Sequence, residues 1–144
     1  MKRPEQALQR AIVKYLQVHE NQGKLMFFHA ANGGQRSEIE AAIFKGLGVK
    51  AGASDLIIFL PGPNVALLEL KAPGRKLTKL QIEFQERASK FGAHTFTISD
   101  VNAAIGTINA LVKAYPVRQP DPEPPKAAPS QIAPPTRERL MAGR

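Results

Sequence analysis

The chain has 144 residues, a formal net charge of +8 and no cysteine. This length predicts one domain that can bury a core unaided, and the lack of cysteine excludes a disulfide framework and thiolate zinc sites. The longest apolar runs, residues 56–60 and 65–68, have strand length, so no membrane span is expected. The N-terminus has no apolar signal core, and a cytoplasmic protein is therefore expected. The basic charge favours a polyanionic partner such as nucleic acid, although proteins are basic for other reasons too.

The first predicted element is an amphipathic helix at residues 5–18. Pro4, at the start of this helix, takes a first-turn position, where proline is tolerated. Glu5 lies on the apolar stripe of this helix, at i, i+3 and i+7 spacing with two of its members. The apolar residues of the stripe are Leu8, Ala11, Ile12, Tyr15 and Leu16.

The next segment predicts a strand, a turn and a second helix. The strand is expected at residues 25–29, and a turn at residues 32–34. Ser37 and Glu40 have the spacing of a capping box, which predicts a helix start. The side chains of this helix that we expect to face inward are Ile39, Ala42, Ile43 and Leu47.

A β-hairpin is predicted next, with strands at residues 55–60 and 65–71 around a Pro/Gly/Asn turn. Three further elements complete the domain. They are a helix started by Thr78 and Gln81 and ended at Gly92, a strand at residues 94–99, and a helix capped by Asp100. The predicted order is α-β-α-β-β-α-β-α, which favours an α/β fold with a mixed sheet flanked by helices.

The C-terminal segment differs in composition from the rest of the chain. Residues 116–144 are dense in proline and almost free of periodic apolar residues. Because proline fixes φ and removes backbone donors, we expect an extended or disordered tail. The sequence therefore predicts one folded domain, residues 1–115, followed by this tail.

The hairpin contains charges where burial is expected. If its loop spans residues 60–64, Asp55 lies opposite Glu69. Lys71 shares the face of Glu69 in any register, because side chains along a strand alternate with period two. Two carboxylates about 5 Å apart repel by roughly 3 kcal/mol at an effective dielectric near 20. A shared proton or a bound cation relieves that repulsion. The oxygen donors suit Mg²⁺ or Mn²⁺, with Glu5 as a candidate third carboxylate and the Leu70 carbonyl as a further ligand.

The sequence resembles a known nuclease family. Asp55 followed by Glu69-Leu70-Lys71 fits D-x(n)-E-x-K, the signature of the PD-(D/E)XK nucleases. A longer set of segments resembles the VRR-NUC family within that superfamily; one departure is Ser54, where the family commonly has proline. The segments are ANGGQRS from residue 31, GLGVKAGASDLIIF from residue 46, ALLELKAPGRKLTKLQ from residue 66, and FGAHTFTIS from residue 91.

The resemblance implies a restriction-endonuclease-like core and a set of functional residues. Catalytic roles fall to Asp55, Glu69, Lys71 and Gln81. A divalent metal, Mg²⁺ or Mn²⁺, would be held by Glu5, Asp55, Glu69 and the carbonyl of Leu70. DNA contacts would come from Asn32, Gln35, Arg36, Arg75, Lys76 and Lys79, although the first three also fit a plain turn and the last three a solvated basic loop.

The expected function is hydrolysis of phosphodiesters in structured or branched DNA, in the manner of a Holliday-junction resolvase. Resemblance to the stand-alone VRR-NUC proteins of phages and bacteria implies a homodimer in a bacterial cell, possibly phage-encoded. Two alternatives remain open from the residues alone. One is a nicking or restriction-like endonuclease on ordinary duplex, and the other is a non-catalytic DNA-binding accessory protein.

Overall fold

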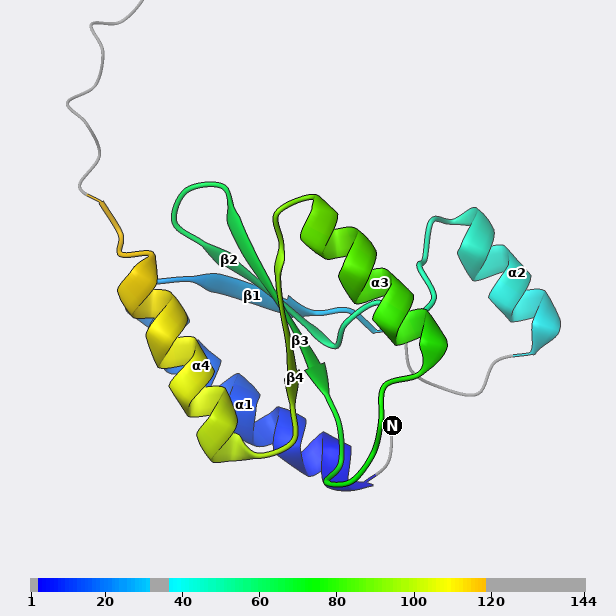
Figure 1. Cartoon of the computed structure of the whole chain (residues 1–144), viewed down its shortest axis with the longest axis horizontal. Coiled ribbons are helices and arrows are strands. Elements are labelled where there is room, and N and C mark those ends of the chain that lie inside the picture. Colours follow the sequence, from blue (N-terminus) through cyan, green and yellow to red (C-terminus); the bar gives the residue numbers. More distant parts are fainter. Residues whose placement is uncertain (1–2, 32–36, 119–144) are drawn as a thin grey trace, which may run out of the picture.

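A computed structural model describes residues 3–31 and 37–118 of the chain. Within these ranges the predicted order of elements is confirmed (Figure 1). The predicted turn at residues 32–34, together with Gln35 and Arg36, lies outside the described residues, as does the tail from residue 119 onward. The elements are α1 (Arg3–Asn21), β1 (Met26–His29), α2 (Glu38–Gly46), β2 (Leu56–Leu60), β3 (Asn64–Leu70), α3 (Lys79–Lys90), β4 (His94–Ile98) and α4 (Val101–Ala114).

The four strands form one mixed sheet in the order β1-β2-β3-β4. β1 and β3 both pair with β2 in antiparallel fashion, whereas β4 pairs with β3 in parallel. In the hairpin, Leu56 lies opposite Leu68 and Leu60 lies opposite Asn64. This is the predicted register, and it decides which hairpin side chains share a face, because a slip of one residue would reverse every side chain.

The main core lies between one face of the sheet and the helices α1 and α4, which run side by side (Figure 1). The apolar stripe predicted for the first helix is buried there, as is one face of α4. Alternate positions of β2 and β3 complete the core, as expected for a strand with one face covered. The most deeply buried members are Ile12, Leu16, Leu56, Ile58, Ala66, Leu68, Ala104 and Ile108.

Helix α3 lies against the opposite face of the sheet, beside β4. Its Gln85 side chain donates to the hydroxyl oxygen of Thr97 at 3.4 Å. The start of α3 also approaches the loop before β2 very closely, at Gly52. A Cβ at Gly52 would lie 2.3 Å from the carbonyl oxygen of Leu80, and Gly52 has φ +75°. Only glycine allows this approach, which fixes the start of α3 beside Asp55.

Side-chain caps start three of the helices, as predicted. Ser37 and Glu40 form a complete capping box at α2, and Thr78 and Gln81 form another at α3. Asp100 caps α4 by accepting a hydrogen bond from the Ala103 amide at 2.8 Å. Because these bonds satisfy amides that have no partner within the helix, they fix where each helix begins.

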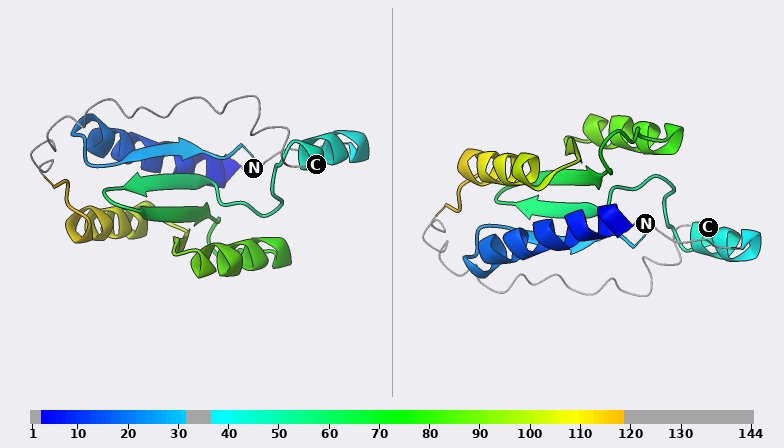
Figure 2. Two further views of the ribbon diagram at one scale, coloured as in Figure 1. Left: turned by 90° about the horizontal axis from the view of Figure 1, so that it is seen from above. Right: turned by 90° about the horizontal axis from the view of Figure 1, so that it is seen from below.

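The prediction that the apolar side chains of α2 face inward is wrong. No residue of α2 is buried, and Ile39, Ile43 and Leu47 are all strongly exposed. Helix α2 projects beyond the layered part of the molecule in every view (Figures 1 and 2). The spacing of its apolar residues is sufficient to indicate a helix. Neither the sheet nor another helix of the described residues covers the apolar face of α2. None of the helices in the described ranges is long and apolar enough to cross a membrane.

Candidate active site

Two acidic residues from the hairpin meet at the C-terminal end of β3. Asp55 directly precedes β2, and continuing the observed register places it opposite Glu69. The Oδ2 atom of Asp55 accepts a hydrogen bond from the backbone amide of Leu70 at 2.7 Å. The carboxylate of Asp55 therefore lies across the end of β3, as the predicted turn requires.

Glu69 is the most buried acidic side chain in the described residues, with a relative exposure of 3%. Its Oε1 atom accepts a hydrogen bond from Nε2 of Gln81 at 2.5 Å and lies 3.9 Å from Nζ of Lys71. Its Oε2 atom is buried and has no hydrogen-bond partner among the described residues. One oxygen of Glu69 is thus fixed by α3, and the other remains available to a ligand.

Gln81 holds Glu69 because of its position in the capping box. Its own Oε1 atom accepts from the Thr78 amide at 2.9 Å, which leaves the side-chain NH₂ free to donate to Glu69. The two predicted roles of Gln81, helix capping and contact with the site, are therefore served by one conformation. The start of α3 thereby becomes part of the site.

Glu5 reaches the same region from the first turn of α1. Its Oε1 atom accepts a hydrogen bond from the Ala72 amide, directly after the hairpin, at 3.2 Å. Glu5 therefore lies beside the end of the hairpin, and its role as a metal ligand stays a prediction. Residues that are distant in sequence, on α1 and on the hairpin, thus lie at one end of the sheet.

Burial, with a smaller contribution from neighbouring carboxylates, raises the pKa of Asp55 and of Glu69. Burial, followed by the charge of Asp55, raises the pKa of Glu69 to about 8, while Lys71 opposes the shift. Burial also raises the pKa of Asp55, against the lowering effects of the Leu70 amide and of His29. Glu5 contributes a smaller upward effect on both. The repulsion expected from the sequence is therefore present and is only partly offset by Lys71.

The donor set has the chemistry that Mg²⁺ or Mn²⁺ prefers. Glu69 supplies a buried oxygen without a partner, and its raised pKa is the effect that a nearby divalent cation reverses. In contrast, no group of three or more His, Cys, Asp or Glu side chains in the described ranges is arranged to hold a metal ion. Glu5 and Asp55 are bonded to backbone amides instead. The assignment of Glu5, Asp55, Glu69 and the Leu70 carbonyl as metal ligands therefore stays a prediction.

Exposed basic residues lie between the hairpin and α3. Arg75 and Lys76 are exposed in the connecting loop, and Lys79 is exposed in the first turn of α3. Lys79 forms an ion pair with Glu83 at 3.8 Å, which is typical of a helix surface. These three side chains are therefore open to solvent, and their contact with DNA stays a prediction. Asn32, Gln35 and Arg36 lie outside the described residues.

Two residues near the site were not assigned to it from the sequence. His29 ends β1, and its Nδ1 atom lies 2.7 Å from the backbone oxygen of Asp55. Ser54, the departure from the family pattern, is fully buried, and its hydroxyl has no partner. The pairing of β1 with β2 brings His29 to Asp55, and the sequence of β1 contains no signal for that pairing.

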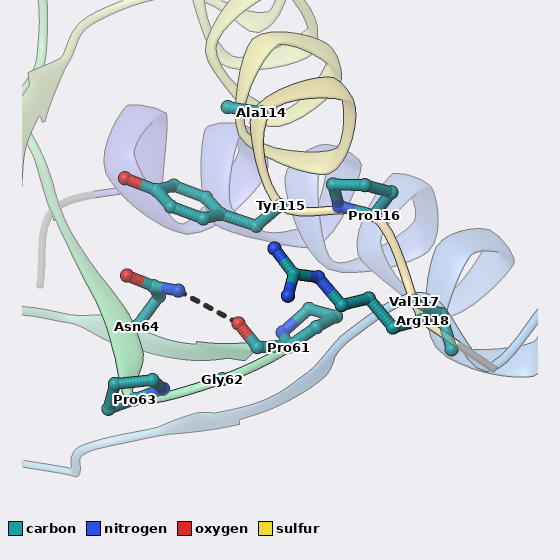
Figure 3. A pocket seen from close by; sticks show the side chains of 9 residues that line it. All are labelled: Pro61, Gly62, Pro63, Asn64, Ala114, Tyr115, Pro116, Val117 and Arg118. Atoms are coloured by element: carbon teal, nitrogen blue, oxygen red, sulfur yellow. Dashed lines mark hydrogen bonds between the residues drawn. The ribbon is translucent and has the colours of Figure 1, made fainter. Parts of the chain in front are cut away.

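The cluster does not coincide with the hollow drawn in Figure 3. That hollow, of about 430 Å³, lies at the hairpin turn, at the opposite end of β3, and its lining includes Pro61, Asn64, Tyr115 and Arg118. No carboxylate lines it, and the Tyr115 hydroxyl is already within 2.9 Å of Nε2 of His94. The chemistry therefore favours the carboxylate end of the sheet as the active site.

A solved structure described as a VRR_NUC domain protein is similar to this chain. The TM-score is 0.62 and the sequence identity 22%, over 78% of this chain and 91% of that one. The chain has the VRR-NUC fold. This mixed sheet with helices on both faces is of the restriction-endonuclease-like class, which confirms the predicted fold. No protein-family model and no curated protein matches the chain.

Proposed function

We propose that this protein is a metal-dependent deoxyribonuclease that hydrolyses phosphodiester bonds in branched DNA. The observation that supports it is the meeting of Asp55, Glu69 and Lys71 at one end of β3, in a chain with the VRR-NUC fold. The similar solved structure is named for its VRR_NUC domain. In such a cluster the lysine attracts a phosphate group, and the carboxylates offer oxygen donors to a divalent cation that can polarise it.

The residues of the cluster have distinct roles in this proposal. Lys71 offers an ammonium group that can orient a water molecule or offset the negative charge that develops on the phosphate. Gln81 fixes one oxygen of Glu69, so that the other points to the ligand. Asp55 faces the same space while the Leu70 amide holds its second oxygen. Preorganisation of this kind is what such a site requires.

Mg²⁺ or Mn²⁺ is the proposed cofactor. Asp55, Glu69 and the carbonyl of Leu70 would hold it, with Glu5 as a further carboxylate. When bound, such an ion lowers the pKa of a coordinated water and neutralises phosphate charge. The protein contributes carboxylates whose pKa values are raised without it, so that binding and deprotonation of Glu69 are coupled.

The proposed substrate is a four-way junction or a similar branch. Arg75, Lys76 and Lys79 would contact the phosphate backbone near the scissile bond, where the start of α3 also favours anions. Asn32, Gln35 and Arg36 would add contacts from the segment before α2. A homodimer would place two active sites on two strands of a symmetric branch.

Cleavage assays test the proposal. The purified protein is incubated with end-labelled junction, flap and duplex DNA in Mg²⁺ or Mn²⁺. We expect junction cleavage that is lost in Asp55→Asn and Lys71→Ala. Lys113→Ala, which changes an exposed lysine of α4, should keep the parental rate. Equal rates on junction and matched duplex would favour a nicking enzyme, and no cleavage of any substrate in either metal would refute nuclease activity.

A second candidate function is DNA binding without catalysis. The observation that favours it is that Glu5 and Asp55 bond to backbone amides and form no three-residue metal cluster with Glu69 in the described residues. Such a protein would bind DNA in a salt-dependent manner, and Lys71→Ala would leave this binding intact. It would also show no parental cleavage to lose.

A further inference from the structure

A groove of about 380 Å³ lies between α3 and the loop before β2. Its apolar side is formed by Leu80, Phe84 and Phe91, the last of which is the C-cap of α3. Positions i, i+4 and i+11 of a helix lie on one side of it, so the three side chains form one surface. Phe91 is 91% exposed, Leu80 is 53% exposed, and Phe84 is half-buried. A contiguous apolar surface of this kind marks a binding site.

The charged side chains at this α3 groove are mostly basic. Lys50 and Arg87 line the groove and are exposed. Lys90, directly before Phe91, is exposed as well. The lining also contains Glu83, but its carboxylate pairs with Lys79 at 3.8 Å, which offsets its charge. The ligand that complements the groove therefore has both an apolar surface and negative charge.

The α3 groove begins beside the candidate active site. Leu80 directly precedes Gln81, whose side chain donates a hydrogen bond to Glu69 at 2.5 Å. The backbone of Leu80 is also the part of α3 that Gly52 approaches closely. With a rise of 1.5 Å per residue, the distance along the helix from Leu80 to Phe91 is about 17 Å. A strand bound at the carboxylates therefore has a path along α3 to Phe91.

We propose that the α3 groove binds unpaired DNA, with one base stacked on the ring of Phe91 and the neighbouring phosphates bound by Lys50 and Arg87. Proteins that bind single strands combine cations that follow the backbone with aromatic rings on which bases stack. In an intact duplex the bases already stack on one another, so their faces are closed to Phe91. The inference rests on the proposed nuclease function only in placing this strand next to the scissile bond. The binding itself requires neither metal nor cleavage.

Fluorescence of a single tryptophan provides the first test, since the chain has no tryptophan of its own. The full-length Phe91→Trp variant is titrated, in the presence of a chelator, with a short single-stranded oligonucleotide and with a blunt duplex of the same sequence. We expect saturable quenching by the single strand and little change with the duplex. Val18→Trp, at a 51% exposed position of α1, should not respond to either. Absence of quenching, equal quenching by the duplex, or equal quenching at both positions would overturn the proposal.

Fluorescence polarisation of the labelled single strand separates base stacking from plain apolar contact. Phe91→Tyr keeps an aromatic ring and should bind within about twofold of the parent, whereas Phe91→Leu should raise the dissociation constant by at least about fivefold. Circular dichroism verifies that both variants fold. A Phe91→Leu variant that binds as tightly as the parent would contradict stacking at this residue.

The salt dependence of the same binding tests the phosphate contacts. Arg87→Ala should reduce the slope of log binding constant against log salt concentration by about 0.7, the value for one phosphate contact on a single strand. Lys113→Ala, on α4, should leave the slope unchanged, and equal slopes for all three proteins would refute the contact at Arg87. Both sets of measurements are made without metal. A chain that binds in this way but cleaves nothing would refute only the nuclease proposal, whereas cleavage without quenching would refute only this inference.

Discussion

Replacing Glu69 by glutamine is expected to stabilise the metal-free protein at neutral pH. Burial and the charge of Asp55 raise the pKa of Glu69 in the folded state to about 8, from an ordinary value of 4.5. The folded protein therefore binds a proton that the unfolded chain releases in this range. Stability from this group is fully present below pH 4.5 and is lost as the pH rises toward 8. Glutamine has the shape of the protonated form and does not titrate.

The size of the effect follows from the same values. A solution at pH 7 is about 2.5 units above the ordinary pKa of 4.5, so Glu69 is ionised in the unfolded chain. In the folded protein the same group is still mostly protonated at pH 7, because its pKa is about 8. Each unit corresponds to about 1.4 kcal/mol, so Glu69→Gln should gain up to about 3 kcal/mol in free energy of unfolding. For a domain of this size the melting temperature should rise by roughly 10 °C. At pH 4.5 the gain should almost disappear.

Thermal and urea unfolding at pH 4.5, 7 and 8.5, in the presence of a chelator, measure this effect. Glu83→Gln is the matched control, because the Glu83 side chain is 50% exposed and pairs with Lys79 on the helix surface. The control should change stability by no more than about 0.5 kcal/mol at any of these pH values. A destabilised Glu69→Gln at pH 7, or a gain that persists unchanged at pH 4.5, would show that the carboxyl cluster is not strained as described.

Two further predictions concern other parts of the fold. Gly52→Ala should lower the free energy of unfolding by at least about 2 kcal/mol, because the new Cβ would meet the Leu80 backbone. Gly74→Ala is the control, since Gly74 has a similar positive φ but open space around it, and it should lose about 1 kcal/mol. Urea unfolding measures both losses, and equal losses would refute the close approach at Gly52. Burial, followed by the charge of Lys24, lowers the pKa of His19, so the free energy of unfolding should fall as the pH drops below 6.5. His19→Phe should reduce this pH dependence in unfolding curves measured from pH 5 to 7. An unchanged pH dependence in the variant would contradict the prediction.

The hairpin register and the helix starts could be predicted from the sequence because both depend on local chemistry. A Pro/Gly/Asn turn sets the pairing of Leu56 with Leu68, and with it the position of Asp55 opposite Glu69. Capping boxes likewise set the starts of α2 and α3. The site was therefore largely predictable wherever it depends on the hairpin and on Gln81.

The remaining features depend on tertiary packing, for which the sequence has no local signal. The apolar periodicity of α2 indicates a helix face, but not whether anything in the same chain covers it, and the inward prediction failed for that reason. The position of His29 depends on which strand pairs with β1. The close contact at Gly52 depends on where α3 lies relative to a loop 28 residues earlier in the chain. Each of these requires knowledge of how the layers assemble.

The most direct test of the central claim is a crystal of the protein soaked in Mn²⁺, with its anomalous signal measured. The account predicts one ion at the C-terminal end of β3, bound by carboxylate oxygens of Asp55 and Glu69 and by the Leu70 carbonyl, at about 2.0–2.3 Å. The Oε2 atom of Glu69, which has no hydrogen-bond partner in residues 3–31 and 37–118, should be among the ligands. A fully soaked crystal without an anomalous peak there, or with Asp55 and Glu69 turned away from the ion, would contradict the account.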